Sequence, residues 1–237
     1  MAHKYQNPFK TLSPFQKILW LSSLAVITIS FLLVPDKDYL TLIASLIGAT
    51  ALILVGNGDP FGQVLCIFFS LIYAVISYTY RYYGEMITYL VMSAPAALVC
   101  AIEWFKHPHR EGENQVRVET LSVRKWLLLL SSVVVVTIVF YFVLEHFGTN
   151  NLLVSTISVA TSWFAAMLTL FRSPYYGIAY AVNDIVLIVL WIMASIVDIS
   201  YLPMILCFVV FLLNDLYGFY NWTCIKKNQS ISITEVR

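Results

Sequence analysis

Apolar residues occur in eight runs along the chain, and each run is long enough to cross a lipid bilayer as a helix. A membrane-spanning helix needs about 20 mostly apolar residues. The breaks between the runs carry turn residues, for example GNGDP at 56–60 and RSP at 172–174. The pattern therefore predicts an all-α integral membrane protein with eight transmembrane helices, at residues 15–34, 39–56, 61–80, 86–104, 126–144, 152–171, 175–196 and 200–222.

The composition indicates a protein with little mass outside the bilayer. Of the 237 residues, 60% are apolar and 11% are charged, whereas an ordinary soluble domain is nearer half apolar and a quarter charged. The formal net charge of +1 gives no reason to expect a nucleic-acid partner. We expect residues 1–237 to form a single membrane domain that has the lipid bilayer as a partner, with one long loop at 105–122.

Lysine and arginine fall unequally on the two sides of the membrane. If successive helices cross in alternating directions, the side that holds both termini carries 12 of these residues, and the other side carries only Lys37 and Arg81. Positively charged residues favour the cytoplasmic side, so we expect both termini and the 105–122 loop to be cytoplasmic. We assign Glu85 to a loop on the opposite side.

The chain contains an internal repeat. LSPFQKILWLSSLAVITISF, which starts at Leu12, and LSVRKWLLLLSSVVVVTIVF, which starts at Leu121, share ten of 20 positions, including the paired serines Ser23 and Ser132. Trp104 and Trp222 end the fourth helix of each copy. The predicted repeats are 12–106 and 121–227, with four helices each, so both copies point the same way. Transporters with such parallel repeats bind their substrate between the copies near the bilayer midplane.

Two Asn–Asp pairs lie inside apolar runs, in YAVNDIVLIVLW at 180–191 and NDLYGFYNW at 214–222. Both pairs are roughly 10–16 Å from the cytoplasmic side at 1.5 Å per residue. A charged group at the bilayer centre costs about 3 kcal/mol or more, so these side chains should face a protein interior. With the aromatic residues that share their helical faces, they form the first set of predicted substrate-binding residues: Asn183, Asp184, Asn214, Asp215, Tyr180, Trp191 and Tyr217.

Further candidates come from other helices, and each has a structural alternative. Gln63 and Tyr73 accompany a stripe of small polar residues on the third run, and Trp163 lies beside the stripe Ser155, Ser158 and Ser162 on the sixth. Buried amides and carboxyls also bond helices to one another, and serine stripes are often close-packing surfaces.

Several features of the sequence favour no special chemistry. Aromatic residues near helix ends, namely Trp20, Tyr39, Trp104 and Trp222, are typical of interfacial anchors. The four cysteines show no metal-ligand spacing, so no metal site and no cofactor are predicted.

Four segments together resemble the PnuC family of bacterial nicotinamide riboside transporters: RYYGE at 81–85, the W-x-K that ends the fourth helix, SPYYGIAYAVNDIVLIVLW at 173–191 and NDLYGFYNW at 214–222. The resemblance implies a SWEET-like fold, with two three-helix bundles joined by a linker helix plus an N-terminal helix. It also implies a homotrimer in the bacterial inner membrane. The implied activity is facilitated diffusion of nicotinamide riboside, which cytoplasmic phosphorylation then traps.

The resemblance leaves the ligand open at three positions. This chain has Tyr89 where many members have asparagine, and Ala96–Ala97 where they have Met–Gln, so Tyr89 joins the candidates for substrate contact. Because some relatives are associated with thiamine and riboflavin, another vitamin or a nucleoside is an alternative substrate. A second alternative is that Asp184 or Asp215 couples transport to protons. An intramembrane aspartyl protease and a non-transporting scaffold are remote alternatives. No nucleophile–base pair is visible, so we do not expect an enzyme.

Overall fold

The computed structural model describes residues 5–33, 37–79, 83–110, 112–149 and 151–235, and in these ranges the fold is built from helices. Eight of its helical stretches are long and apolar enough to cross a membrane, which confirms the predicted all-α, eight-helix membrane protein. They are α1 (Pro14–Leu33), α2 (Tyr39–Gly56), α3 (Pro60–Thr79), the stretch Tyr83–Lys106, α6 (Val123–His146), α7 (Leu152–Leu170), α8 (Tyr176–Val197) and α9 (Leu202–Glu235).

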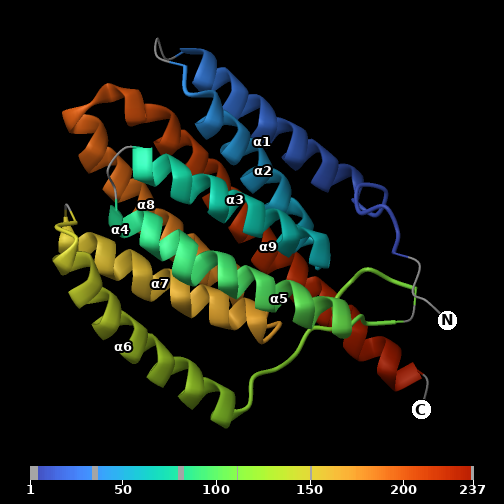
Figure 1. Ribbon diagram of the computed structural model, residues 1–237. Coiled ribbons are helices and arrows are strands. Elements are labelled where there is room, and N and C mark those ends of the chain that lie inside the picture. The colour runs from blue at the N-terminus through green and yellow to red at the C-terminus, as the bar shows by residue number, and fades with distance from the viewer. Residues whose placement is uncertain (1–4, 34–36, 80–82, 111, 150, 236–237) are drawn as a thin grey trace.

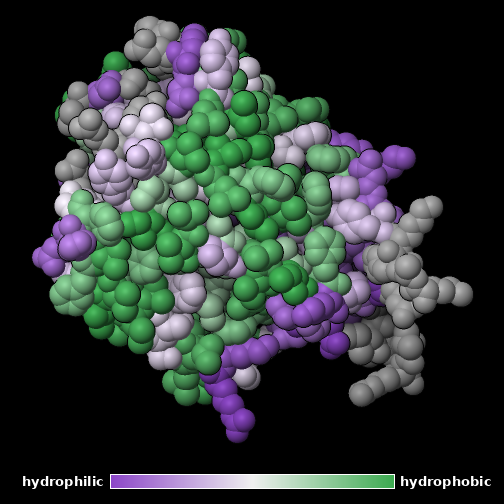
Figure 2. All heavy atoms as spheres, in the orientation of Figure 1, coloured by the Kyte–Doolittle hydropathy of each residue, from purple (hydrophilic) through white to green (hydrophobic). Residues whose placement is uncertain are grey.

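The helices pack as two groups with two peripheral members. In Figure 1 both termini lie at one end of the bundle, here called the termini end, and the opposite end is called the far end. Helix α3 packs against both α2 and the fourth span, and α8 packs against both α7 and α9. Helix α1 covers α2 and α9, whereas α6 packs mainly on α7. Figure 2 shows an apolar band across the middle of one face, with polar residues concentrated towards the ends.

The fourth span differs from the single helix predicted at 86–104. It begins three residues earlier and consists of α4 (Tyr83–Ile87), a π-helical segment (Thr88–Ser93) and α5 (Ala94–Lys106). Glu85, which we had assigned to a loop, lies in α4 and is 9% exposed. A π-helical turn inserts one residue into the helical repeat and often marks a functional site.

The last helix is also longer than predicted. It continues past Trp222 to Glu235, because its polar last turns pack on the 107–122 loop. The Gln229 side chain accepts a hydrogen bond from Val118 N at 2.9 Å and donates one to Val116 O at 3.1 Å. Beyond residue 222, contacts with the loop stabilise the helix, rather than burial in the membrane.

The two halves of the chain show the same local structure at equivalent turns. Gly58 and Arg172 both have positive φ, of 75° and 54°. The residue after each, Asp59 or Ser173, donates its backbone N–H to the carbonyl five residues earlier. This geometry closes the α2–α3 and α7–α8 turns in the same way.

The prediction that Trp104 and Trp222 are interfacial anchors is wrong, because both side chains are fully buried. Each indole N–H donates across the molecule to the other half. Trp104 Nε1 lies 3.1 Å from Thr169 O, and Trp222 Nε1 lies 2.9 Å from Val55 O. Their rings are in contact at a centroid distance of 5.2 Å. Tyr39 is 65% exposed, as an anchor would be.

Candidate functional site: a cavity between the two halves

A central cavity of about 120 Å³ lies between the two halves of the bundle. Helices α2, α3, α5, α7, α8 and α9 and the π-helical segment all contribute to its walls. Among the described residues that line it, none is Lys, Arg or His. Its polar lining consists of Gln63, Ser70, Ser93, Ser162, Asn183, Asp184 and Asp215.

Two carboxyl groups meet in this cavity. Asp184 on α8 and Asp215 on α9 are each 4% exposed, and their carboxyl groups are close neighbours. Asp184 Oδ2 has no hydrogen-bond partner among the described residues. A buried polar atom without a partner calls for an explanation, and a bound cation would supply one.

The helices that carry these carboxyl groups approach very closely. A Cβ placed on Gly177 would lie 2.5 Å from the Asp215 carbonyl oxygen and 2.6 Å from Phe219 N. Only glycine fits between the two backbones at this crossing. The close contact fixes the separation of the two helices that carry the carboxyl groups.

Asn183 lines the cavity, and one end of its amide is held by a neighbouring helix. The Thr161 hydroxyl on α7 lies 2.8 Å from Asn183 Oδ1 and fixes the carbonyl end of the side chain. The Nδ2 group makes no hydrogen bond with the described residues, and Asn183 is 6% exposed. The site therefore offers a preorganised donor beside two carboxyl acceptors.

Aromatic rings form much of the remaining wall. Tyr176 and Tyr180 lie one turn apart on α8, with ring centroids 6.4 Å apart. On the other side, Phe69 meets Tyr89 at 6.0 Å and Phe211 at 5.8 Å, both edge to face. Aromatic faces attract cations as well as other aromatic rings. The cavity thus combines acidic groups, amides and aromatic surface.

Comparison with known proteins identifies the family. The sequence profile described as nicotinamide mononucleotide transporter matches residues 38–224. The chain belongs to this family of transporters. It is 30% identical over 220 residues to the nicotinamide riboside transporter PnuC of Neisseria mucosa, covering 91% of this chain and 83% of that protein.

Two further relatives agree with this assignment. The nicotinamide riboside transporter PnuC of Haemophilus influenzae is 24% identical over 90% of this chain and 92% of its own length. The crystal structure of the vitamin B3 transporter PnuC superposes with a TM-score of 0.80 at 29% identity, covering 92% of this chain and 94% of that one. The resemblance stated from the sequence is confirmed.

In this family member, six of the 11 predicted site residues line the central cavity: Gln63, Tyr89, Tyr180, Asn183, Asp184 and Asp215. Tyr73 lies directly behind the lining, 1% exposed, with its ring centroid 4.3 Å from that of Tyr89. Trp191 lies one turn beyond Leu187 and lines a second pocket at the far end. Tyr73 and Trp191 therefore form part of the layer between the two pockets.

Asn214, Trp163 and Tyr217 lie outside the cavity lining and contact the peripheral helices. Asn214 Nδ2 donates to Ser23 Oγ on α1 at 3.0 Å and to Val210 O at 2.8 Å. Trp163 Nε1 donates to Ser132 Oγ on α6 at 3.0 Å. The Tyr217 ring lies 5.3 Å from Phe15 of α1. Ser23 on α1 and Ser132 on α6 are equivalent positions in the sequence repeat. Each accepts a hydrogen bond that attaches a peripheral helix to the bundle.

Sequence reasoning missed several residues that line the cavity. Aligning Gly62 with Gly177 pairs Phe69 with Asp184, and aligning Trp104 with Trp222 pairs Ala97 with Asp215. These four residues all line the same cavity. The alignment itself was the signal, because equivalent positions in two facing repeats point to a shared interface. Three further aromatic lining residues that were not predicted as binding residues are Tyr176, Phe208 and Phe211.

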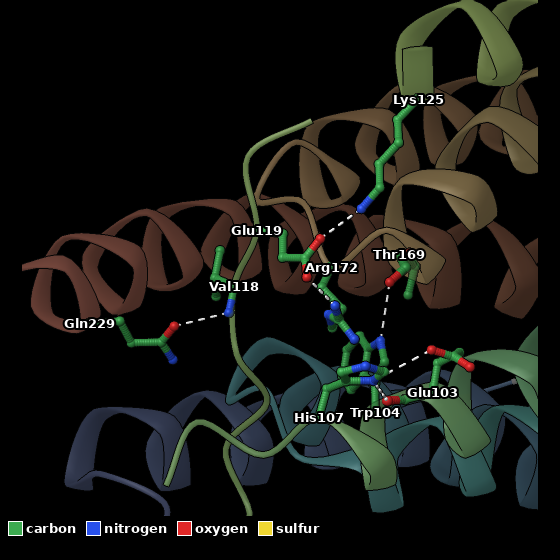
Figure 3. Close-up of polar contacts among 9 residues, drawn as sticks. All are labelled: Glu103, Trp104, His107, Val118, Glu119, Lys125, Thr169, Arg172 and Gln229. Atoms are coloured by element: carbon green, nitrogen blue, oxygen red, sulfur yellow. Dashed lines mark hydrogen bonds and ion pairs between the residues drawn. The ribbon is translucent and has the colours of Figure 1, made fainter. Parts of the chain in front are cut away.

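A polar network closes the termini end of this transporter fold (Figure 3). Glu119 in the loop pairs with Arg172, which follows α7, and with Lys125 of α6 at 2.7 Å. Partial burial opposes ionisation of Glu119, but its bonds to Lys125 and Arg172 outweigh that effect and hold the pKa of its carboxyl below the ordinary value.

The N-terminal segment joins the same end of the molecule. Tyr5 donates to Asp59, and Asn114 Nδ2 donates to the other Asp59 oxygen at 2.9 Å. Burial raises the pKa of Asp59, although these bonds oppose that shift. Together the contacts of Glu119 and Asp59 attach the loop to both halves of the bundle.

Proposed function

We propose that this protein carries nicotinamide riboside across the bacterial inner membrane, with the central cavity as the binding site. The observation that carries the proposal is the pairing of Asp184 and Asp215 beside aromatic rings and the Asn183 amide. Nicotinamide riboside has a positively charged pyridinium ring, a carboxamide and a ribose. The carboxyl groups complement the charge, the rings of Tyr180 and Tyr89 complement the pyridinium, and Asn183 serves the carboxamide or the ribose.

The charge of the cavity favours the riboside over the mononucleotide. Nicotinamide mononucleotide adds a phosphate group, and the described lining offers no cationic side chain to pair with it. An unpaired anion beside buried carboxyl groups is strongly disfavoured, because charges interact strongly where the dielectric constant is low. Thiamine is a second candidate, since it is also an aromatic cation. The uncharged, larger riboflavin fits this lining less well.

We infer transport by facilitated diffusion, in which the two halves alternately expose the cavity. The cavity volume of about 120 Å³ is below the roughly 300–1,000 Å³ of typical ligand pockets. Substrate binding therefore requires the lining to move apart. The distribution of Lys and Arg supports a cytoplasmic location for both termini. There, phosphorylation of the substrate by a separate enzyme keeps the vitamin inside.

We further propose that the chain has no catalytic activity of its own and that it works as a homotrimer. The aspartates serve as countercharges for the substrate, although proton coupling through Asp184 and Asp215 is the alternative mechanism. A scaffold without transport would not need acidic and aromatic side chains around one cavity. An intramembrane protease would need the carboxyl pair to be open to a polypeptide.

Calorimetric titration of the purified protein tests the ligand. Nicotinamide riboside should bind, and the mononucleotide should bind at least about 100-fold more weakly, equivalent to about 2.7 kcal/mol. Thiamine and riboflavin serve as competing candidates. Equal affinity for riboside and mononucleotide would contradict the charge argument.

Uptake into proteoliposomes tests the mechanism. Labelled riboside should equilibrate without any ion gradient, and Asp184→Asn should slow this equilibration. Accumulation above the external concentration that a proton ionophore abolishes would instead establish proton-coupled transport.

A further inference from the structure

A second pocket of about 440 Å³ opens at the far end of the bundle. The start of α4, the α6–α7 connection and the end of α8 surround it. Its lining includes Glu85, Thr149, Trp191 and Tyr201. We call it the far-end pocket; in the topology proposed above it faces the outside of the cell.

The far-end pocket contains a buried carboxyl group that nothing in the described structure neutralises. Glu85 is 9% exposed, and it has neither a hydrogen bond nor an ion pair with the described residues. The Thr149 hydroxyl in the same lining is also buried without a hydrogen-bond partner in that part of the chain. Burying a charged or polar group without partners is costly, so both groups point to a ligand that supplies them.

Aromatic surface lies beside this acidic group. Trp191 is 5% exposed, and its ring centroid is 5.6 Å from that of Tyr201. Both rings belong to the lining that also contains Glu85. A carboxyl group next to tryptophan and tyrosine is a suitable site for an organic cation with a flat ring, because the countercharge and the ring faces act on the same ligand.

The far-end pocket adjoins the central cavity along two helical segments. On α8, Leu187 lines the cavity and Trp191 lines the far-end pocket, four residues or roughly 6 Å further along the helix. On the fourth span, Tyr89 lines the cavity and Glu85 lines the far-end pocket, again four residues apart. The π-helical segment begins at Thr88, between these two levels. Only about one helical turn therefore separates the two pockets.

We propose that the far-end pocket is a second binding site for an aromatic cation, which receives the substrate before it enters the central cavity. Glu85 supplies the countercharge, and Trp191 and Tyr201 supply the stacking surface. The proposal rests on the proposed function for the identity of the cation, a pyridinium riboside. Its role is to concentrate a positively charged substrate at the mouth of the transport path.

The test compares Glu85→Gln with a matched control at the same end. Glu145→Gln removes one negative charge from the exposed end of α6, outside the far-end pocket. Glu85→Asp keeps the charge. Initial uptake of labelled nicotinamide riboside is measured in intact cells whose own transporter has been deleted. We expect Glu85→Gln to raise KM about three- to tenfold, which corresponds to about 0.7–1.4 kcal/mol, while Glu145→Gln stays within about twofold of wild type and Glu85→Asp raises KM less than Glu85→Gln does.

A neutral ligand separates electrostatic recruitment from structural damage. The reduced, uncharged dihydro form of nicotinamide riboside keeps the ribose and the carboxamide but lacks the ring charge. Its KM should not change in Glu85→Gln. An equal rise of KM for both ligands, or a wild-type KM for the charged ligand in Glu85→Gln, would overturn the proposal.

A binding measurement keeps this inference independent of transport. The cation 1-methylnicotinamide quenches the fluorescence of tryptophan that it contacts, so it should quench the purified wild-type protein more than Trp191→Phe. Glu85→Gln should weaken this quenching about three- to tenfold in apparent affinity. If the wild type does not transport the riboside yet shows this Glu85-dependent quenching, the proposed function fails and the far-end site stands. If quenching is the same in all three proteins, the far-end site is refuted.

Discussion

Asn183 and Asn214 offer a matched pair of substitutions, because each precedes an aspartate on consecutive helices yet contacts a different part of the protein. Asn183 lines the central cavity, whereas Asn214 donates to Ser23 on α1 and to Val210 O. Asn183→Ala should weaken substrate binding and lower stability only by the single lost bond from Thr161, about 0.6 kcal/mol. Asn214→Ala should lower stability more and leave substrate binding unchanged.

The structure sets the size of both effects. Asn183→Ala removes the unused N–H donors from the cavity and leaves the ligand group that they serve unpaired. That loss costs about 1–3 kcal/mol, or roughly 5- to 150-fold in Kd. Asn214→Ala removes two bonds between or within membrane helices. Such bonds average about 0.6 kcal/mol and reach about 1.7 kcal/mol, so the variant should lose about 1 kcal/mol of stability.

Calorimetric titration with nicotinamide riboside and thermal melting in the same detergent measure both quantities on each variant. Thr161→Val is a useful third protein, since it removes the hydroxyl that holds the Asn183 carbonyl. It should weaken binding less than Asn183→Ala does. Wild-type affinity in a folded Asn183→Ala protein would refute the ligand role, and reduced affinity in Asn214→Ala would show that the two sites are not separable.

Three further predictions concern the framework of the site. Gly177→Ala places a Cβ 2.5 Å from the Asp215 carbonyl and should lower stability by about 1–3 kcal/mol in melting experiments. Trp104→Phe and Trp222→Phe each remove an indole donor from a buried carbonyl that keeps a backbone donor, Arg172 N or Gly58 N, so each should cost about 0.5–1.5 kcal/mol for the lost hydrogen bond; a much smaller loss in one would show that the two halves are not equivalent there. The pKa of Glu119 is lower in the folded protein than its ordinary value of 4.5, so the ionised carboxylate stabilises the loop at pH values above 4.5. This stabilisation is lost as the pH falls through the folded pKa. The protection of the 112–122 amides against hydrogen exchange, relative to their intrinsic rate at each pH, should therefore fall in acid, and Glu119→Gln should remove that pH dependence of the protection.

The sequence was sufficient to predict the number and approximate position of the transmembrane helices, because a bilayer requires long apolar runs and little else produces them. It was not sufficient at the two places where protein contacts replace lipid. The polar end of α9 is helical because Gln229 binds the 107–122 loop. The buried Trp104 and Trp222 resemble interfacial anchors in sequence, and only the contact between the halves distinguishes them.

Helical periodicity located the part of the site on α8 but not the part on α9. Tyr180, Asn183 and Asp184 lie on one face of α8, and that face lines the cavity. On α9, consecutive residues point about 100° apart, so Asp215 reaches the cavity while Asn214 reaches α1. Periodicity identifies a polar face, but it does not say which neighbouring helix covers that face. Because α1 covers the outer side of α9, both the face of α9 towards the cavity and the face towards α1 are buried.

The two ends of the cavity are closed by different kinds of contact, and this difference bears on transport. At the termini end, Trp104 and Trp222 donate hydrogen bonds across the halves, and the 107–122 loop adds ion pairs. Towards the far end, the closing layer includes the rings of Tyr73 and Tyr89, which are in contact at an interplanar angle of 44°. Ring packing tolerates small displacements, whereas opening the termini end breaks two buried indole–carbonyl hydrogen bonds, each worth about 0.5–1.5 kcal/mol. The described conformation is therefore locked at the termini end and can open more easily towards the far-end pocket, where a cation held by Glu85 would enter.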